Sequence, residues 1–137
     1  GIAASGRTPY VLGAMTAAKQ AGATVCSISS TPGSPVDQLA DIRMSPDTGP
    51  EVVTGSTRLK SGTAQKLILN MLSTCAMIKT GRVYENLMIC VSPSNDKLKA
   101  RCANITAEIL GITADKAFEL LSLHDFNIRE VIDEYKK

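Results

Sequence analysis

The first ten residues constrain the fold most, because they combine an apolar stretch, a small polar turn and a proline. Residues 2–4 predict the end of a short buried strand, and residues 5–8 predict a tight turn. Pro9 suits the first turn of a helix over 9–21, since proline lacks an amide hydrogen that the first turn leaves unpaired anyway.

The next elements follow at the spacing of an α/β protein. Gly22 fits the C-terminal cap of the first helix, and residues 23–29 predict a second buried strand. A strand, a helix and a strand at this spacing form a βαβ unit with parallel strands. The loop 30–35 then lies at the carboxyl end of a strand, where open α/β sheets bind ligands. A short helix over 36–40 and a short third strand over 41–44 complete this part.

The turn between the first strand and helix has the composition of an anion site. Free backbone amides at a helix N-terminus favour a bound oxyanion. Ser5 and Thr8 add hydroxyl donors, Gly6 allows close approach of the backbone, and Arg7 supplies a guanidinium. The turn has neither a dinucleotide fingerprint nor a P-loop, so it suits a single phosphate on a small molecule. Small polar turns also open many βαβ units that bind nothing, and this alternative remains open.

A second polar cluster, 55–63, opens the longest helix of the chain. Glu51 stands shortly before it and is a candidate base or a ligand to sugar hydroxyls, with a solvated loop residue as the alternative. Ser56 and Thr57 are candidate partners of Glu51 at the substrate. Lys60 either reaches a phosphate or is exposed.

The long helix begins at Arg58 or Thr63 and ends at Thr80, before Gly81. Its apolar residues recur with helical period, and the charge-free run 67–78 is typical of a core helix. The apolar stripe is wider than one small sheet needs, so it is also a candidate dimer surface.

The C-terminal part is expected to be helical. Residues 83–91 predict a strand or an extended packing arm, and residues 96–110 predict a helix closed by Gly111. Two short helices follow within 113–137, and His124 between them is expected to be a hinge or a cap. Their expected N-caps are Thr113 and either Asp125 or Asn127.

Bulk composition excludes several classes of function. The net charge is +2, and aromatic residues make up 4% of the 137 residues, which argues against nucleic-acid binding. No run of 18 apolar residues predicts a membrane span. Four cysteines without a Cys-x-x-Cys pair, together with one histidine, predict buried free thiols, no metal site and a cytoplasmic protein.

Three runs carry a family resemblance: Ile-Ala-Ala-Ser-Gly-Arg-Thr-Pro-Tyr, Pro-Gly-Ser-Pro, and Gly-Pro-Glu-Val-Val-Thr-Gly-Ser-Thr-Arg-Leu-Lys-Ser-Gly-Thr-Ala-Gln-Lys. They resemble the N-acetylmuramic acid 6-phosphate etherases of the sugar isomerase (SIS) superfamily. The resemblance implies an α/β fold with a doubly wound parallel sheet of SIS type, partial here, and a homodimer that uses no metal or organic cofactor. It also implies a sugar-phosphate-binding domain over 1–92 and a small helical subdomain over 93–137.

The reaction implied by the resemblance is cleavage of the D-lactyl ether of N-acetylmuramic acid 6-phosphate. In that family, a phosphate loop and two glutamates credited with acid–base chemistry precede the strand that opens this chain. The chain is therefore expected to be part of a longer enzyme and inactive alone. The alternatives are a non-catalytic sugar-phosphate-binding regulator and an aldose–ketose isomerase that uses a glutamate at the place of Glu51.

Overall fold

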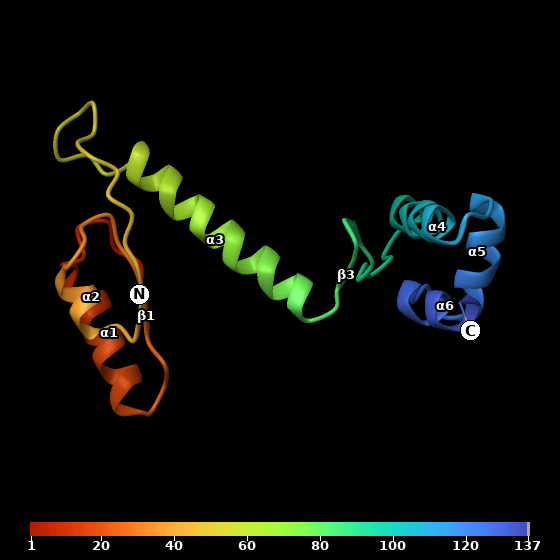
Figure 1. Ribbon diagram of the computed structural model, residues 1–137, viewed down its shortest axis with the longest axis horizontal. Coiled ribbons are helices and arrows are strands. Elements are labelled where there is room, and N and C mark those ends of the chain that lie inside the picture. Colours follow the sequence, from red (N-terminus) through yellow and green to blue (C-terminus); the bar gives the residue numbers. More distant parts are fainter. Residues whose placement is uncertain (137) are drawn as a thin grey trace. The chain divides into compact units, whose positions relative to one another are not determined.

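The computed structural model describes residues 1–136 and divides into two compact units (Figure 1). The first unit is Gly1–Ser73, and the second begins at Thr74. The expected division into a sugar-phosphate domain, 1–92, and a helical subdomain, 93–137, is a functional one and remains a prediction.

The first unit contains the parallel pairing expected from the βαβ spacing. Strand β1, Cys26–Ile28, pairs in parallel with β2, Ile42–Met44. Ile2 forms a parallel bridge to Ile28 on the other edge of β1. The fully buried strand expected at residues 2–4 is therefore wrong in part: a single bridge forms there, and Ile2 is 45% exposed.

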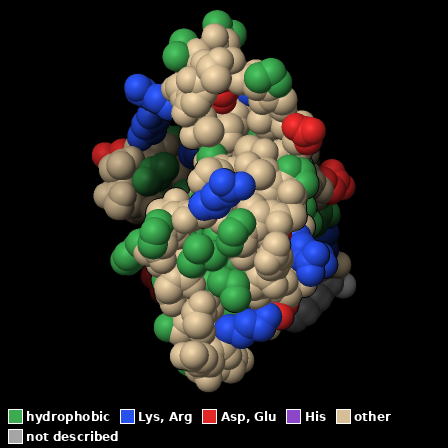
Figure 2. Space-filling model, turned by 90° about the vertical axis from the view of Figure 1, so that its left-hand side faces the viewer, with side chains coloured by type: hydrophobic (Ala, Val, Ile, Leu, Met, Phe, Trp, Pro, Cys, Tyr) green, Lys and Arg blue, Asp and Glu red, His purple; other side chains and the backbone are tan. Residues whose placement is uncertain are grey.

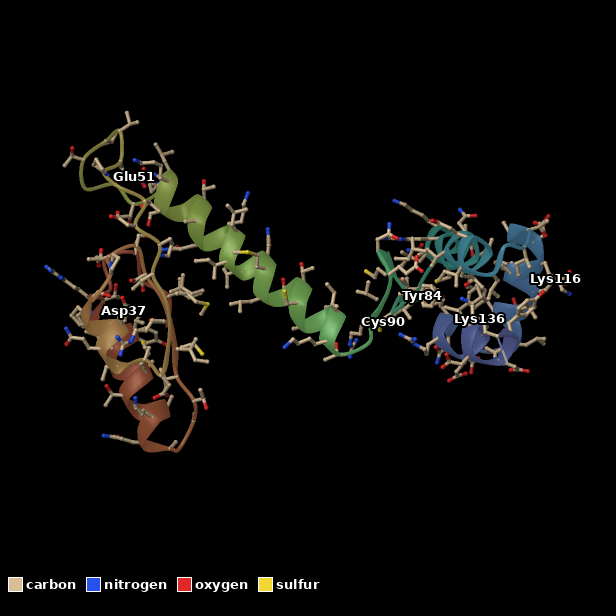
Figure 3. All side chains as sticks on the ribbon, in the orientation of Figure 1. Asp37, Glu51, Tyr84, Cys90, Lys116 and Lys136 are labelled. Atoms are coloured by element: carbon tan, nitrogen blue, oxygen red, sulfur yellow. The ribbon has the colours of Figure 1, made fainter. Side chains whose placement is uncertain are left out.

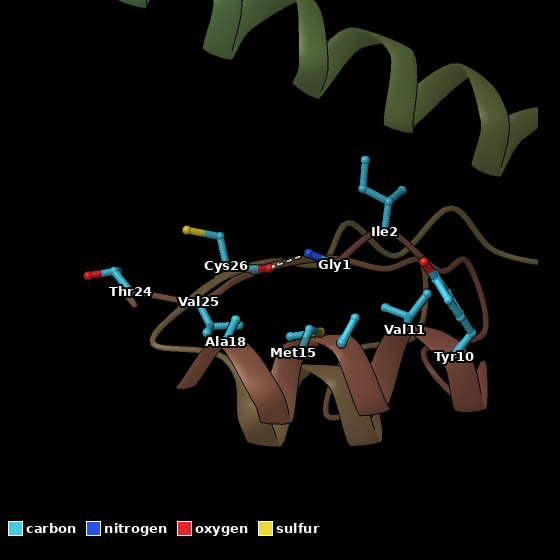
Figure 4. Close-up of a pocket in the computed structure, with 10 residues that line it drawn as sticks. Gly1, Ile2, Tyr10, Val11, Met15, Ala18, Thr24, Val25 and Cys26 are labelled. Atoms are coloured by element: carbon cyan, nitrogen blue, oxygen red, sulfur yellow. Dashed lines mark hydrogen bonds between the residues drawn. The ribbon is translucent and has the colours of Figure 1, made fainter. Parts of the chain in front are cut away.

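Two helices cover one face of these strands (Figure 4). They are α1, Pro9–Gln20, and α2, Pro35–Leu39. Their buried contacts with the strand region involve Met15, Val25, Val36 and Ala40. Because burial of apolar area is the main favourable term in folding, this cluster fixes both helices on the sheet.

Helix α1 ends as its sequence predicts. Gly22 has a positive φ of 82°, its N–H donates to the Lys19 carbonyl, and the Ala23 N–H donates to the Ala18 carbonyl. These two bonds form a Schellman motif, which satisfies the last carbonyls of the helix.

The long helix, α3, runs over Lys60–Lys79. Its expected role as a core helix is wrong, because Ser61 is its only buried residue in the described chain. Six large apolar side chains of α3 are at least two-fifths exposed: Leu67, Leu69, Met71, Leu72, Met77 and Ile78. The small sheet is covered by α1 and α2 alone, so this apolar surface has no partner within residues 1–136.

The strands of the second unit form a hairpin, where a single strand or an extended arm over 83–91 was expected. Strands β3, Val83–Tyr84, and β4, Leu87–Met88, pair antiparallel. The chain reverses at Glu85, which has a φ of 52°. Non-glycine residues rarely adopt a positive φ, and the apolar pattern of residues 83–91 therefore did not reveal the turn.

Three helices form the core of the second unit: α4, Asp96–Leu110; α5, Ala114–Leu123; and α6, Ile128–Tyr135. Leu121 and Ile128 are fully buried in this core. The N-cap side chains are Asn95, Thr113 and Asn127, each of which accepts a hydrogen bond from a backbone amide of its helix. Asp125 is therefore not the cap of α6, while His124 is the C-cap of α5.

The cysteines do not all behave as expected. Cys102 is buried, but Cys75 and Cys90 are exposed, which corrects the expectation of buried thiols. All four are free. Over residues 1–136, no helix has both the length and the apolarity that crossing a bilayer requires.

Candidate functional site

A polar cavity of about 260 Å³ lies in the first unit at the carboxyl ends of its parallel segments. It is lined by Ala4, which follows the Ile2 bridge, by Ser30 and Thr31 after β1, and by the loop between β2 and α3. This position is where open α/β sheets place their ligands, because the loops that follow parallel strands meet at one edge.

Glu51 lines this cavity and is bound to the start of α3 (Figure 3). Its Oε2 lies 3.0 Å from the Lys60 nitrogen, and its Oε1 lies 3.1 Å from the Ser61 nitrogen. The first amides of a helix have no partner within the helix and carry partial positive charge, so a carboxylate is stabilised there. These hydrogen bonds, from Lys60 and then Ser61, lower the pKa of Glu51 below its usual value.

The hydroxyl of Ser61 connects this helix start to the loop after β1. Ser61 is 2% exposed, and its Oγ hydrogen bonds to Oγ of Ser30. The Ser30 N–H donates to the Ala4 carbonyl at 2.9 Å. One hydrogen-bonded path thus joins the first strand segment, the loop after β1, the start of α3 and Glu51.

Three other residues of the second polar cluster lie in different surroundings. Thr57 lines the cavity, whereas Ser56 does not. Lys60 contributes its backbone amide to Glu51, and its exposed side chain places Nζ near Gly49 of the loop before α3. The structure therefore brings Glu51, Thr57 and the backbone of Lys60 together.

The turn 5–8 does not line the cavity, although the preceding Ala4 does. Ser5, Arg7 and Thr8 are exposed, and Thr8 is the N-cap of α1 without a side-chain hydrogen bond to the helix. Gly6 is buried and has a φ of 64°. A Cβ at Gly6 would lie 2.0 Å from the Ser34 Oγ, so this position requires glycine.

Sequence reasoning missed one buried acidic residue, Asp37 of α2, which is 1% exposed. Its carboxylate accepts hydrogen bonds from Ser27, Ser29 and Ser45 and from the Gly33 amide. The signal in the sequence was weak, because a lone aspartate near the start of a helix is common and is usually exposed.

An apolar groove in the first unit is not a candidate for the same chemistry. It has a volume of about 340 Å³ and lies between α1 and the strand segments (Figure 4). No charged side chain lines it; the lining includes Ile2, Tyr10, Met15 and Val25. A site that holds a sugar phosphate needs convergent polar groups, which the Glu51 cavity has and this groove lacks.

Neither the surface charge nor the grouping of possible metal ligands indicates a second functional site within residues 1–136. Lysine and arginine side chains are spread among uncharged and apolar ones on the face that Figure 2 shows. No group of three or more histidine, cysteine or acidic residues within 1–136 is arranged to hold a metal ion.

The parallel strands and the polar cavity at their carboxyl ends define the first unit as an α/β segment of the ligand-binding type. Curated homologues that are 50–67% identical over most of this chain are named N-acetylmuramic acid 6-phosphate etherase, and the chain matches their C-terminal part. No family model matches the chain.

Two relatives illustrate the match. The etherase of Aliivibrio fischeri (strain MJ11) is 58% identical over 132 residues, which cover 96% of this chain and 44% of that protein. The etherase of Aeromonas hydrophila is 67% identical over 108 residues, which cover 79% of this chain and 36% of that protein. The chain therefore spans less than half the length of the relatives it matches.

Proposed function

We propose that this chain is the C-terminal part of an N-acetylmuramic acid 6-phosphate etherase, a carbon–oxygen lyase of bacterial cell-wall sugar recycling. The observation that carries the proposal is the 58% identity to a protein of this name along 96% of the chain. The match extends over 132 of the 137 residues.

The proposed reaction splits the D-lactyl ether of N-acetylmuramic acid 6-phosphate. A base removes a proton from the carbon next to the ether carbon, the ether C–O bond breaks, and lactate leaves after its oxygen gains a proton. Water then adds to the resulting double bond, which gives N-acetylglucosamine 6-phosphate. A positioned base and a positioned acid typically contribute about 100- to 10,000-fold each to the rate of such a reaction.

Within this chain, we assign Glu51 to sugar binding, with proton transfer as the less favoured role. The lowered pKa of Glu51 makes its carboxylate a weak base, and both of its oxygens already accept backbone hydrogen bonds. Carboxylate oxygens have further lone pairs and can accept hydrogen bonds from sugar hydroxyls. Ser56, Thr57 and Lys60 are proposed as neighbouring substrate contacts.

The phosphate is proposed to bind at the turn Ser5, Gly6, Arg7 and Thr8. Support comes from the exposed side chains of Ser5, Arg7 and Thr8 and from the start of α1, whose N-cap side chain makes no hydrogen bond to the helix. Amides at such a position favour phosphate groups.

We further propose a cytoplasmic homodimer with a doubly wound SIS-type sheet. The exposed apolar surface of α3 supports the dimer, because surfaces of this kind are usually covered by a partner. The parallel pairing of β1 with β2 supports the proposed doubly wound sheet, because the strands of such a sheet are parallel. The four free cysteines support the cytoplasmic location, where thiols stay reduced.

A D-lactate assay tests the etherase proposal. The full-length protein that contains this chain should release D-lactate from N-acetylmuramic acid 6-phosphate, and the 137-residue chain alone should release none. Binding of N-acetylglucosamine 6-phosphate by the full-length protein without D-lactate release would contradict the proposal and support the non-catalytic regulator. Turnover by the chain alone would show that the acid–base pair lies within it.

A further inference from the structure

Asp37 is a buried carboxylate to which the proposed reaction gives no role. Its Oδ1 lies 2.7 Å from the Ser27 Oγ, and its Oδ2 lies 2.7 Å from the Ser45 Oγ and 3.1 Å from the Gly33 nitrogen. The Ser29 Oγ lies 3.3 Å from both carboxylate oxygens. Because a buried polar group without a partner is strongly unfavourable, this set of partners holds the side chain in one place.

The alternation of β1 explains why hydroxyl groups surround Asp37. Successive side chains of a strand point to opposite faces, so Ser27 and Ser29 share a face. Both are fully buried, and both bind Asp37 of α2. The serines therefore obtain their partner from the helix that covers this face.

Three of the four partners of Asp37 lie in two loops that line the cavity, and the fourth, Ser27, lies on β1. The first loop, 29–34, joins β1 to α2, and Ser29 and Gly33 belong to it. The second loop, 45–59, joins β2 to α3, and Ser45 is its first residue. One carboxylate thus binds both loops, and other residues of each loop line the cavity, among them Ser30, Thr31 and Glu51.

Hydrogen bonds connect the first loop, which binds Asp37, to Glu51. Ser29 is followed directly by Ser30, whose Oγ hydrogen bonds to the Ser61 Oγ. The Ser61 amide binds the Glu51 carboxylate at 3.1 Å. A shift of the first loop would therefore change the start of α3 and the position of Glu51.

The charge of Asp37 is stabilised by these donors. Burial raises the pKa of Asp37, but the hydrogen bonds from Ser45, Ser27, Gly33 and Ser29 together lower it further, so that it lies below its usual value. The carboxylate is ionised at neutral pH and accepts every bond, as hydroxyl and amide donors require.

We infer that Asp37 is a positioning residue for the proposed substrate cavity. Its contacts with Ser29, Gly33 and Ser45 fix the two loops that line the cavity. The inference rests on the proposed function only for the identity of the ligand. Asp37 does not line the cavity, so it acts through the two loops.

The test compares Asp37→Asn with Val36→Ala in the 137-residue chain. The asparagine keeps the size of the side chain but has one acceptor oxygen instead of two. Val36 is fully buried on the same helix and makes no side-chain bond to the loops, so its truncation is a control for lost stability. The first measurement is hydrogen exchange of the Lys60 and Ser61 amides, which are the donors to Glu51.

We expect Asp37→Asn to reduce the protection of these two amides by about tenfold or more, as loss of hydrogen bonds to a charged group predicts. Val36→Ala should leave them within about twofold of the parent chain after correction for global stability. Unchanged protection in Asp37→Asn, or an equal loss in both variants, would overturn the inference. If Asp37→Asn does not fold, Ser45→Ala removes a single donor and should change the same amides in the same direction; no change there would also overturn it.

The second measurement is calorimetric titration with N-acetylglucosamine 6-phosphate. If the parent chain binds this probe, Asp37→Asn should weaken the affinity by about tenfold while Val36→Ala does not. Equal affinity in parent and Asp37→Asn would overturn the positioning role. If the parent chain does not bind the probe, the assignment of the ligand fails, and the exchange measurement still decides the role of Asp37.

Discussion

The carboxylate of Glu51 binds the Ser61 amide at the start of α3, with Oε1 3.1 Å from the nitrogen. The same carboxylate lines the polar cavity at the carboxyl ends of the parallel strands. Stability of the helix start and the chemistry of the cavity therefore depend on one side chain. Ligand binding and the order of residues 60–61 are expected to change together.

Replacing Glu51 by glutamine tests this double role. Glutamine has one acceptor oxygen and no charge, so it can satisfy only part of the helix start and binds sugar hydroxyls less well. We expect the affinity for N-acetylglucosamine 6-phosphate to fall by about tenfold, since hydrogen bonds to charged groups contribute about 1.5–3 kcal/mol. Calorimetry measures the change, and Glu85→Gln, at the exposed hairpin turn, is the control. Equal affinities in the two variants would favour the solvated-loop alternative.

The pKa values of three carboxylates in the first unit predict how its stability changes at acidic pH. The pKa values of Asp37, Asp41 and Glu51 lie below their usual values. The carboxylate of Asp37 contacts only hydroxyl groups and an amide. The carboxylate of Asp41 contacts the ammonium group of Lys19 and the Val25 amide. The carboxylate of Glu51 contacts the Lys60 and Ser61 amides and lies near the Lys60 charge.

A lowered pKa in the folded state stabilises the fold fully above the unfolded-state value, which is about 4 for these groups. This contribution is lost as the pH falls through the folded-state values. We expect these three groups to leave the melting temperature nearly constant between about pH 7 and pH 5. At pH values below about 4, the melting temperature should decrease. Thermal unfolding followed by circular dichroism measures it. A melting temperature that stays constant down to pH 2.5 would contradict the expectation.

The close contact of Gly6 with Ser34 predicts a large effect of one methyl group. Gly6→Ala places a Cβ 2.0 Å from the Ser34 Oγ at a φ of 64°. Gly22→Ala is the matched control, because Gly22 has a φ of 82° and open space around the new Cβ. We expect Gly22→Ala to cost about 1–2 kcal/mol from backbone strain alone, and Gly6→Ala to cost about 1–3 kcal/mol more from the overlap. Urea unfolding measures both, and equal costs would show that Ser34 moves away freely.

The exposed apolar surface of α3 predicts self-association. Leu67, Met71 and Ile78 lie on one stripe of the helix by their spacing and are 50%, 59% and 53% exposed. We expect the chain to form dimers in sedimentation velocity experiments at high concentration. Met71→Asp should shift the population towards monomer, because a charge would be buried in the interface. Ser73→Asp adds the same charge on the other side of the helix and should leave the dimer intact. A compact monomer in the parent chain would contradict the dimer.

Much of the secondary structure was predictable because its signals are local. Pro9 and Gly22 bound α1, Asn95 begins α4, and Gly111 ends it. Each of these signals acts within about one helical turn, through a fixed φ, a missing amide hydrogen or a side-chain cap. The parallel pairing of β1 and β2 also followed from the spacing of strand, helix and strand.

The tertiary structure decided the features that depend on contacts between distant residues. Asp37 can be buried because serines eight to ten residues away, on β1, directly after β1 and directly after β2, supply hydrogen-bond donors. Residues 83–91 fold back as a hairpin whose Tyr84 meets Lys136 of the last turn of the chain. The sequence alone placed Glu51 beside a polar cluster, but only the fold binds its carboxylate to the amides of Lys60 and Ser61. The physical reason is that a carboxylate in a loop has many possible partners, and the packing of the surrounding elements selects one of them.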